Sequence, residues 1–212
     1  MELDEFIRAN TVIEPPPLVQ EIRLHLATEL TPLWYATESY LNQQNIGAPF
    51  WAFAWVGGQA LARYILDRPS VVEGKSIVDI GSGGGIVAIA CALSGARHIL
   101  ALDIDPMAEM VCRMNAELNN VSALITTETA DAITYDLSPF DLILVGDVCY
   151  TRGESHDLAE HVRAEVAPVL FGDPGRQFMP REDLEHLAAY SVPTSKEIEA
   201  DDISEASVWR MI

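Results

Sequence analysis

Asp79-Ile80-Gly81-Ser82-Gly83-Gly84-Gly85 joins two apolar segments of different character. The β-branched run Ser76–Ile80, in which the stretch begins, is typical of a short buried strand, and the run Ile86–Leu93 after it is typical of a helix. A loop with so few Cβ atoms lets a ligand approach the backbone N–H groups closely. Glycines also serve strand-to-helix turns that bind nothing, so the loop indicates a site only together with its context.

Strand and helix patterns alternate on both sides of this loop. We expect a second strand over residues 98–104, which completes a βαβ unit. The alternation predicts an α/β fold with a mostly parallel sheet and helices on both faces. We expect the final two strands to form an antiparallel hairpin at one edge. The other expected helices span residues 58–66, 107–119, 158–166 and 181–190, and the other expected strands span residues 123–127, 141–145, 169–172 and 206–212.

The first part of the chain lacks this alternation. Residues 15–17 are three prolines, typical of a rigid extended entry, and residues 18–44 are helical in places, with Leu33, Trp34 and Leu41 apolar. A Gly-Ala-Pro break follows at residues 47–49. We therefore expect an N-terminal helical cap over residues 1–50 and the α/β unit over residues 51–212, in a single domain overall.

Asp103 lies about 20 residues after the glycine loop, at the end of the second expected strand. There a carboxylate can accept hydrogen bonds from both hydroxyls of a ribose. Dinucleotide enzymes use G-x-G-x-x-G, but Ile86 stands where the third glycine would be. The pattern D-x-G-x-G-x-G, which starts at Asp79, instead resembles the motif of class I (seven-strand) methyltransferases, whose cofactor is S-adenosyl-L-methionine.

This resemblance implies a cofactor site around the glycine loop. The loop would lie against the methionine part, whose positive charge suits an acidic loop. Asp103 would hold the ribose, and Asp131 would contact the adenine amine. The residues expected in this site are Asp79, Gly81, Ser82, Gly83, Gly85, Asp103, Ile104 and Asp131.

The acceptor side is expected at the end of the strand over residues 141–145. Ligands of open parallel sheets bind outside the carboxyl ends of the strands, where this segment delivers Asp147 and Tyr150. We hypothesise that Asp147 attracts and orients an amine, while Tyr150 narrows the channel and faces the cationic nitrogen. The alternative is a strand-end aspartate that caps a helix beside a packed tyrosine.

Two further groups of residues have open roles. The aromatic run with Trp51, Phe53 and Trp55 either packs in the core or lies over the cofactor mouth and the acceptor path, and we include Trp55 among the cofactor-binding residues. Arg176, after a Pro-Gly turn, either pairs internally or meets an acidic group of the substrate. The five histidines are scattered and the three cysteines lack metal-ligand spacing, so we expect no metal site.

The bulk composition narrows the class of partner. With 13 Lys plus Arg against 32 Asp plus Glu, the net charge of −19 would repel phosphate backbones, so we expect no nucleic-acid substrate. The apolar runs are too short to span a bilayer, and the acidic N-terminus does not resemble a secretory signal. Three unpatterned cysteines fit a reducing compartment, and we expect a cytoplasmic protein.

Five segments together resemble bacterial relatives of the electron transfer flavoprotein β-subunit lysine methyltransferases, over nearly the whole chain. They are PFWAFAWVGGQALARYILD, IVDIGSGGG, LDIDP, DLILVGDVCY and FGDPGR. In the wider group a D-x-x-[YF] element marks the acceptor site, matched here by Asp147-Val148-Cys149-Tyr150, although Val56 stands where the family usually has proline. The resemblance implies a Rossmann-like seven-strand sheet, S-adenosyl-L-methionine as cofactor and lysines of the electron transfer flavoprotein β subunit as acceptors.

Two other functions remain open from the residues alone. A small-molecule amine N-methyltransferase, nicotinamide-like, would share the chemistry and differ in acceptor. An NAD(P)-binding oxidoreductase would use the same loop for a different cofactor. A nucleic-acid amino-methyltransferase is disfavoured, because an N-P-P-Y element would be expected where this chain has GDVCY.

Overall fold

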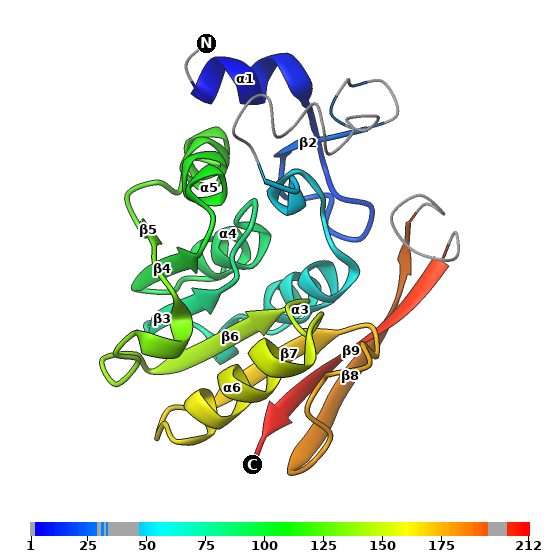
Figure 1. The fold of residues 1–212 in the computed structure, drawn as a ribbon. Helices are drawn as coiled ribbons and strands as arrows, with labels where there is room; N and C mark the ends of the chain where they lie inside the picture. The colour runs from blue at the N-terminus through cyan, green and yellow to red at the C-terminus, as the bar shows by residue number, and fades with distance from the viewer. Residues whose placement is uncertain (1–2, 29–30, 32, 34–46, 195–202) are drawn as a thin grey trace.

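The computed structural model describes residues 3–28, 31, 33, 47–194 and 203–212. Within these residues the main sheet has seven strands in the order β5-β4-β3-β6-β7-β9-β8 (Figure 1). Five strands are parallel, whereas β9 is antiparallel to both β7 and β8. The strands are β3 Ser76–Ile80, β4 His98–Asp103, β5 Ile125–Thr129, β6 Leu142–Gly146, β7 Val169–Asp173, β8 Leu184–Pro193 and β9 Ile203–Met211. The predicted fold class, including the antiparallel edge hairpin, is confirmed.

Successive side chains of the central strands are buried on opposite faces of the sheet. Ile77 belongs to one apolar cluster and Val78 to another, and the same alternation separates Leu144 from Ile143. A strand covered on both faces must be apolar along its length, which explains the uninterrupted β-branched runs of the sequence. The carboxyl ends of β3, β4 and β6 consequently lie side by side at one edge of the sheet.

Helices cover both faces. The first cluster is shared with α3 (Val56–Asp67), α4 (Ile86–Leu93) and α5 (Pro106–Leu118), and the second with α6 (Arg152–Arg163). Figure 1 shows α6 on the side of the sheet away from α3 and α4. None of the helices in the described part of the chain is long and apolar enough to cross a membrane.

The N-terminal segment packs on α5. It begins with α1 (Leu3–Asn10) and continues into a small antiparallel pair, β1 (Val12–Glu14) and β2 (Leu24–Leu26). The amide of Asn115 on α5 ties the pair to the rest of the fold, because its Oδ1 accepts the N–H of His25 at 2.8 Å and its Nδ2 donates to the carbonyl of Gly84 at 2.8 Å. Asn115 thus connects β2 of the N-terminal segment to the glycine loop. The boundary at residue 50 stays a prediction.

Three expected helices need correction. Residues 181–190 do not form a helix, because β8 covers most of this segment and its backbone groups pair with β9. Residues 18–28 contain turns and β2, while residues 34–46 of the same expected segment lie outside the described residues. Helix α6 begins at Arg152, six residues before the expected start. The sequence analysis missed this start because the first turns of the helix are polar and carry no apolar periodicity.

Candidate functional site

The glycine loop between β3 and α4 has the backbone that its sequence requires. Gly81, Gly83 and Gly85 have φ values of +65°, +51° and +82°, a region in which side chains are strained. A Cβ at Gly81 would lie 2.4 Å from Val148 Cγ1, and one at Gly85 would lie 2.5 Å from Cys112 Sγ. Part of the motif therefore serves close packing of the loop, as well as exposing its N–H groups.

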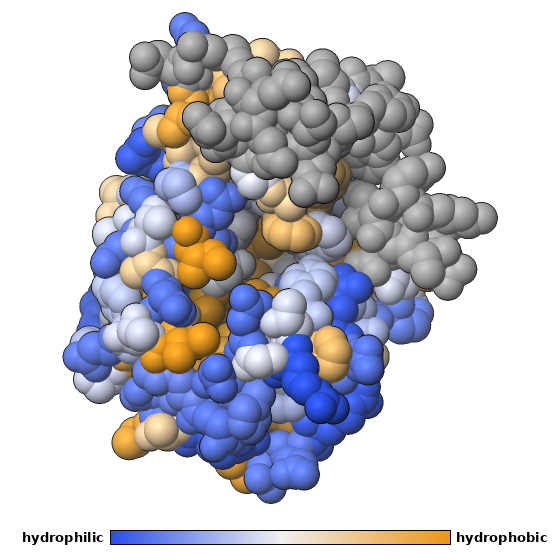
Figure 2. Space-filling model, viewed as in Figure 1, coloured by the Kyte–Doolittle hydropathy of each residue, from blue (hydrophilic) through white to orange (hydrophobic). Residues whose placement is uncertain are grey.

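A pocket of about 430 Å³, its open mouth included, lies over this loop. Figure 2 shows apolar side chains inside a hollow near the middle of the face that it views. Of the predicted residues, Asp79, Gly81, Ser82, Gly83 and Trp55 line the pocket, together with Leu24, Leu26, Trp51, Phe53, Gly58, Gly84, Ile86, Val87 and Gly146.

Two buried donors of this lining have no hydrogen-bond partner among the residues that the structure describes. They are the hydroxyl of Ser82 and the indole Nε1 of Trp51. A buried donor without an acceptor costs about 1–3 kcal/mol, so an anionic group in the pocket would restore what the fold leaves unpaired. Both donors fit the carboxylate of a methionine-like ligand, and the residues present therefore fit the cofactor that the motif implies.

Asp79 supplies the opposite charge to the same pocket. Its side chain is buried and its Oδ2 accepts the N–H of Ala88 at 3.0 Å. Burial raises the pKa of the Asp79 carboxyl to about 8, and the nearby charge of Asp103 contributes to the rise. A cationic ligand would favour the ionised carboxylate, so the site suits a molecule that carries positive charge close to a carboxylate.

Asp103, at the end of β4, lies beside the loop but outside the pocket lining. Its Oδ2 accepts the N–H of Gly83 at 2.8 Å and its Oδ1 accepts the N–H of Asp105 at 3.0 Å. Burial is the main cause that raises the pKa of its carboxyl. The next residue, Ile104, is 71% exposed. Both residues thus border the loop, where a ribose is expected.

Asp131 is exposed and follows Ala130, whose N–H donates to the carbonyl of Asp103 at 2.9 Å. Its Oδ1 accepts the N–H of Ile133 at 3.0 Å and caps the short helix η4 (Ala132–Thr134). The structure therefore gives Asp131 a local structural role, and its contact with adenine stays a prediction.

Asp147, one residue beyond β6, is the most constrained of the predicted acceptor residues. Its φ of +55° is unusual for a residue other than glycine, and its side chain is fully buried. Oδ2 accepts the N–H of Gly57 at 2.8 Å, whereas Oδ1 accepts Nε of Arg176 at 2.8 Å and the hydroxyl of Tyr150 at 3.1 Å. Asp147 therefore caps helix α3, as the alternative interpretation expected of a strand-end aspartate, and it also contacts Tyr150.

Tyr150 forms an aromatic surface beside the pocket. Its ring stacks on Phe50, with centroids 6.1 Å apart, and meets the ring of Trp55 edge-on at 5.9 Å. Phe50 is 60% exposed and Tyr150 is 42% exposed, so this group, which we call the aromatic rim, faces solvent. Trp55 belongs to both the rim and the pocket lining, and the rim thus lies at the mouth where an acceptor would enter.

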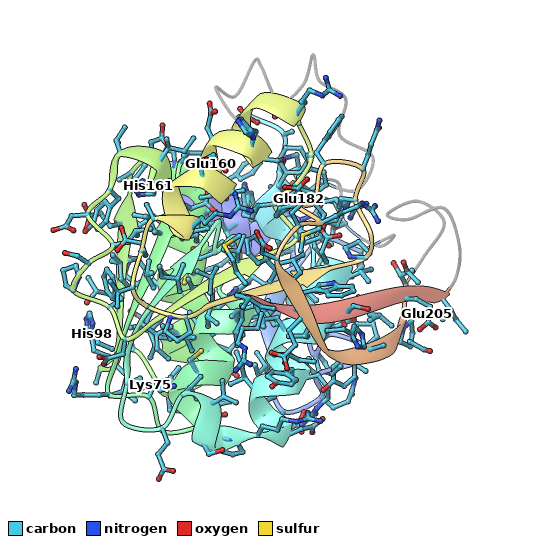
Figure 3. The ribbon with its side chains drawn as sticks, turned by 90° about the horizontal axis from the view of Figure 1, so that it is seen from below. Lys75, His98, Glu160, His161, Glu182 and Glu205 are labelled. Atoms are coloured by element: carbon cyan, nitrogen blue, oxygen red, sulfur yellow. The ribbon has the colours of Figure 1, made fainter. Side chains whose placement is uncertain are left out.

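His98 and His161 lie on different elements of the fold. His98 starts β4 and lies near Thr126, whereas His161 on α6 contacts the carbonyl of Tyr135 (Figure 3). Figure 3 shows the two histidines well apart. Among the described residues, His, Cys, Asp and Glu form no group of three that could hold a metal ion.

Some residues of the pocket escaped the sequence analysis. Leu24 and Leu26 come from β2, and no local signal in the sequence connects them with a loop more than fifty residues away. Gly58 and Gly146 could have been found, since a glycine at a helix start or strand end indicates a close backbone approach. A Cβ at Gly146 would lie 3.4 Å from the Cα of Gly58.

The fold and this site define a class I, Rossmann-like methyltransferase. Residues 59–146 match the family model of the ribosomal protein L11 methyltransferase (PrmA). The structure is similar to magnesium protoporphyrin IX methyltransferase from Synechocystis PCC 6803, solved with bound SAH, with a TM-score of 0.55 and 16% sequence identity. The similarity covers 74% of this chain and 84% of that one.

More specifically, the chain belongs to the family of electron transfer flavoprotein β-subunit lysine methyltransferases. It is 37% identical to the Xenopus laevis protein of that name, over 96% of this chain and 85% of the relative. It is 35% identical to the Rattus norvegicus protein, over 99% and 84%. Membership of this family excludes the oxidoreductase alternative.

Proposed function

We propose that this chain transfers the methyl group of S-adenosyl-L-methionine to lysine side chains of the electron transfer flavoprotein β subunit. One observation carries the proposal. The pocket over the glycine loop, with two unpaired donors and the buried Asp79, opens beside the aromatic rim and the D-x-x-Y residues of the neighbouring strand. The full-length relatives carry this activity in their names. A cytoplasmic location is part of the same proposal.

Different residues around the pocket would bind different parts of the cofactor. Ser82 and Trp51 would donate to its carboxylate, Asp79 would balance its positive charge, and Asp103 would accept from the ribose hydroxyls. When bound, the cofactor supplies an activated methyl group on a sulfonium. Asp131 is proposed to reach the adenine amine, with Ile104 beside the ribose. The glycines at 81, 83 and 85 keep the backbone open for this contact.

The acceptor side has only to position a nitrogen, because methyl transfer from a sulfonium needs little acid catalysis. Asp147 and Tyr150 would place the lysine nitrogen so that its lone pair points at the methyl group. The lysine must be uncharged when the new N–C bond forms, and its proton is lost to solvent. The aromatic rim excludes water from the approach and packs against the lysine's aliphatic stem.

The test uses purified electron transfer flavoprotein and labelled S-adenosyl-L-methionine. We expect label in the β subunit and a mass increase of whole methyl groups on lysine in its peptides. The variant Asp103→Ala serves as a control with a weakened cofactor site. A second reaction with a cell extract fractionated by size tests the small-molecule alternative. Label confined to the small-molecule fraction would exclude the protein substrate.

A further inference from the structure

Among the residues that the structure describes, Arg176 contacts Asp147, Asp173 and Tyr150. Its Nε donates to Asp147 Oδ1 at 2.8 Å, and its backbone N–H donates to Asp173 Oδ1 at 2.7 Å. Its guanidinium carbon lies 4.9 Å from the centroid of the Tyr150 ring. The residue reaches both members of the D-x-x-Y pair from a different strand, since it follows the end of β7.

These contacts change the charge that an acceptor would meet. The side chain of Asp147 is fully buried and that of Arg176 is 21% exposed. In such a place an ion pair is weakly screened, so the guanidinium offsets most of the field of the carboxylate. An ammonium group that approaches Tyr150 therefore meets the guanidinium of Arg176, which is already paired with the carboxylate of Asp147. The same surroundings do not repel an uncharged amine.

We propose that Arg176 is a positioning residue of the acceptor site, which fixes Asp147 and Tyr150 and whose positive charge favours the uncharged, nucleophilic form of the acceptor amine. This inference deepens the proposed function and rests on it. The proton of the lysine ammonium passes to solvent, and the nitrogen lone pair then forms the N–C bond while the S–C electron pair returns to sulfur.

Within the described part of the chain, the titratable groups that contact Arg176 come from the ends of two strands. Asp147 and Tyr150 follow β6, and Asp173 ends β7; the buried Cys149 precedes Tyr150 and lies near Asp147 and Asp173. Burial raises the pKa of the Cys149 thiol to about 12, so this thiol is uncharged near neutral pH. Burial also raises the pKa of the Asp173 carboxyl, whose buried Oδ2 has no hydrogen-bond partner in the segments that the structure describes. The guanidinium of Arg176 is therefore the cation that lies against Asp147 and Tyr150.

The pH dependence of kcat for lysine methylation, at saturating cofactor and saturating protein substrate, tests this role, because kcat reports the titration of groups in the enzyme–substrate complex. In Arg176→Gln the negative charge of Asp147 is no longer offset, so the bound lysine keeps its proton to higher pH. We expect the rising limb of the profile to move upward by about one pH unit and the rate at pH 7 to fall about tenfold. Arg176→Lys keeps the charge and should leave the limb near its wild-type position, with a lower kcat. Arg210→Gln, which removes a surface ion pair with Glu185 on β8, is the control.

Each outcome separates the inference from the proposed function. An equal loss of rate at every pH in Arg176→Gln, with an unmoved limb, would overturn the inference and leave the function intact. A limb that moves in Arg176→Lys as far as in Arg176→Gln would also overturn it, which keeps the test decisive if the glutamine variant does not fold. Wild-type protein that methylates no lysine at any pH would overturn the proposed function itself.

Discussion

The carboxylate of Asp147 accepts the backbone N–H of Gly57 at 2.8 Å, across 90 residues of sequence. Gly57 is the second residue of α3, and Trp55 at the N-cap position of this helix makes no side-chain cap. Asp147 thus caps α3 from the end of β6, and its other carboxylate oxygen accepts a hydrogen bond from the hydroxyl of Tyr150. A single side chain joins the helix whose start lines the pocket to the proposed acceptor site.

The two roles of Asp147 separate in a pair of variants. Asparagine is a good helix cap without charge, so Asp147→Asn should lose methyl transfer while cofactor affinity stays within a few-fold. Asp147→Ala removes the cap and leaves Arg176 without this partner, and we expect it to lower the free energy of unfolding by about 2–4 kcal/mol. Urea unfolding and calorimetric titration with S-adenosylhomocysteine measure both effects. Full activity in Asp147→Asn would contradict the acceptor role.

Gly57 is required by the close approach of α3 to β7. A Cβ at Gly57 would lie 2.3 Å from the carbonyl oxygen of Gly172, so Gly57→Ala should cost about 3 kcal/mol or more. Gly153 is the matched control, because it is the second residue of α6 and a Cβ there has nothing within 4 Å. Gly153→Ala should change stability by less than about 1 kcal/mol, in the stabilising direction. Thermal unfolding of both variants checks this, and similar midpoints would refute the packing argument.

The hydroxyl of Ser82 tests whether the pocket holds an anionic group. Ser82→Ala removes a buried donor without a partner, so the stability of the free protein should stay the same or rise slightly. Its affinity for S-adenosyl-L-methionine should fall about tenfold, the loss of one hydrogen bond to a charged group. The hydroxyl of Ser94 is also buried and has no partner in the described part of the chain, but Ser94 is the C-cap of α4 and is not in the pocket lining. Ser94→Ala should leave affinity unchanged, and equal affinities of the two variants would count against the assignment.

Asp79 should make stability depend on pH. Burial raises the pKa of its carboxyl to about 8, whereas an unfolded aspartate has a pKa of about 4. The folded protein therefore holds a proton that the unfolded chain has lost between these values. This contribution is fully present below about pH 4 and is lost as the pH rises to about 8, with a slope of up to about 1.4 kcal/mol per pH unit.

Asp79→Asn should flatten this dependence, because the amide does not titrate. Urea unfolding at pH 5, 6, 7 and 8 measures the slope. The exposed Asp131→Asn is the control and should keep the wild-type slope. An Asp79→Asn variant whose stability still falls as steeply as that of the wild type would show that other groups cause the dependence.

Local signals in the sequence were sufficient for the elements that repeat a simple pattern. The β-branched runs predicted the central strands because a strand buried on both faces must be apolar throughout. The segment 181–190 was wrongly expected to be helical, since its leucines and alanines favour a helix while pairing with β9 decides for a strand. A pairing partner about twenty residues away leaves no periodic mark on the segment itself.

The sequence by itself determined the alternating α/β order, the glycine loop, Asp103 at the next strand end and the D-x-x-Y element, because each depends on neighbours along the chain. Only the tertiary structure decided that Asp147 caps α3, that Arg176 is its ion partner and that Leu24 and Leu26 reach the pocket. These contacts join segments that are far apart in the sequence and meet only in the folded chain. Their energies come from burial and from charge in a weakly screened interior, which no local pattern encodes.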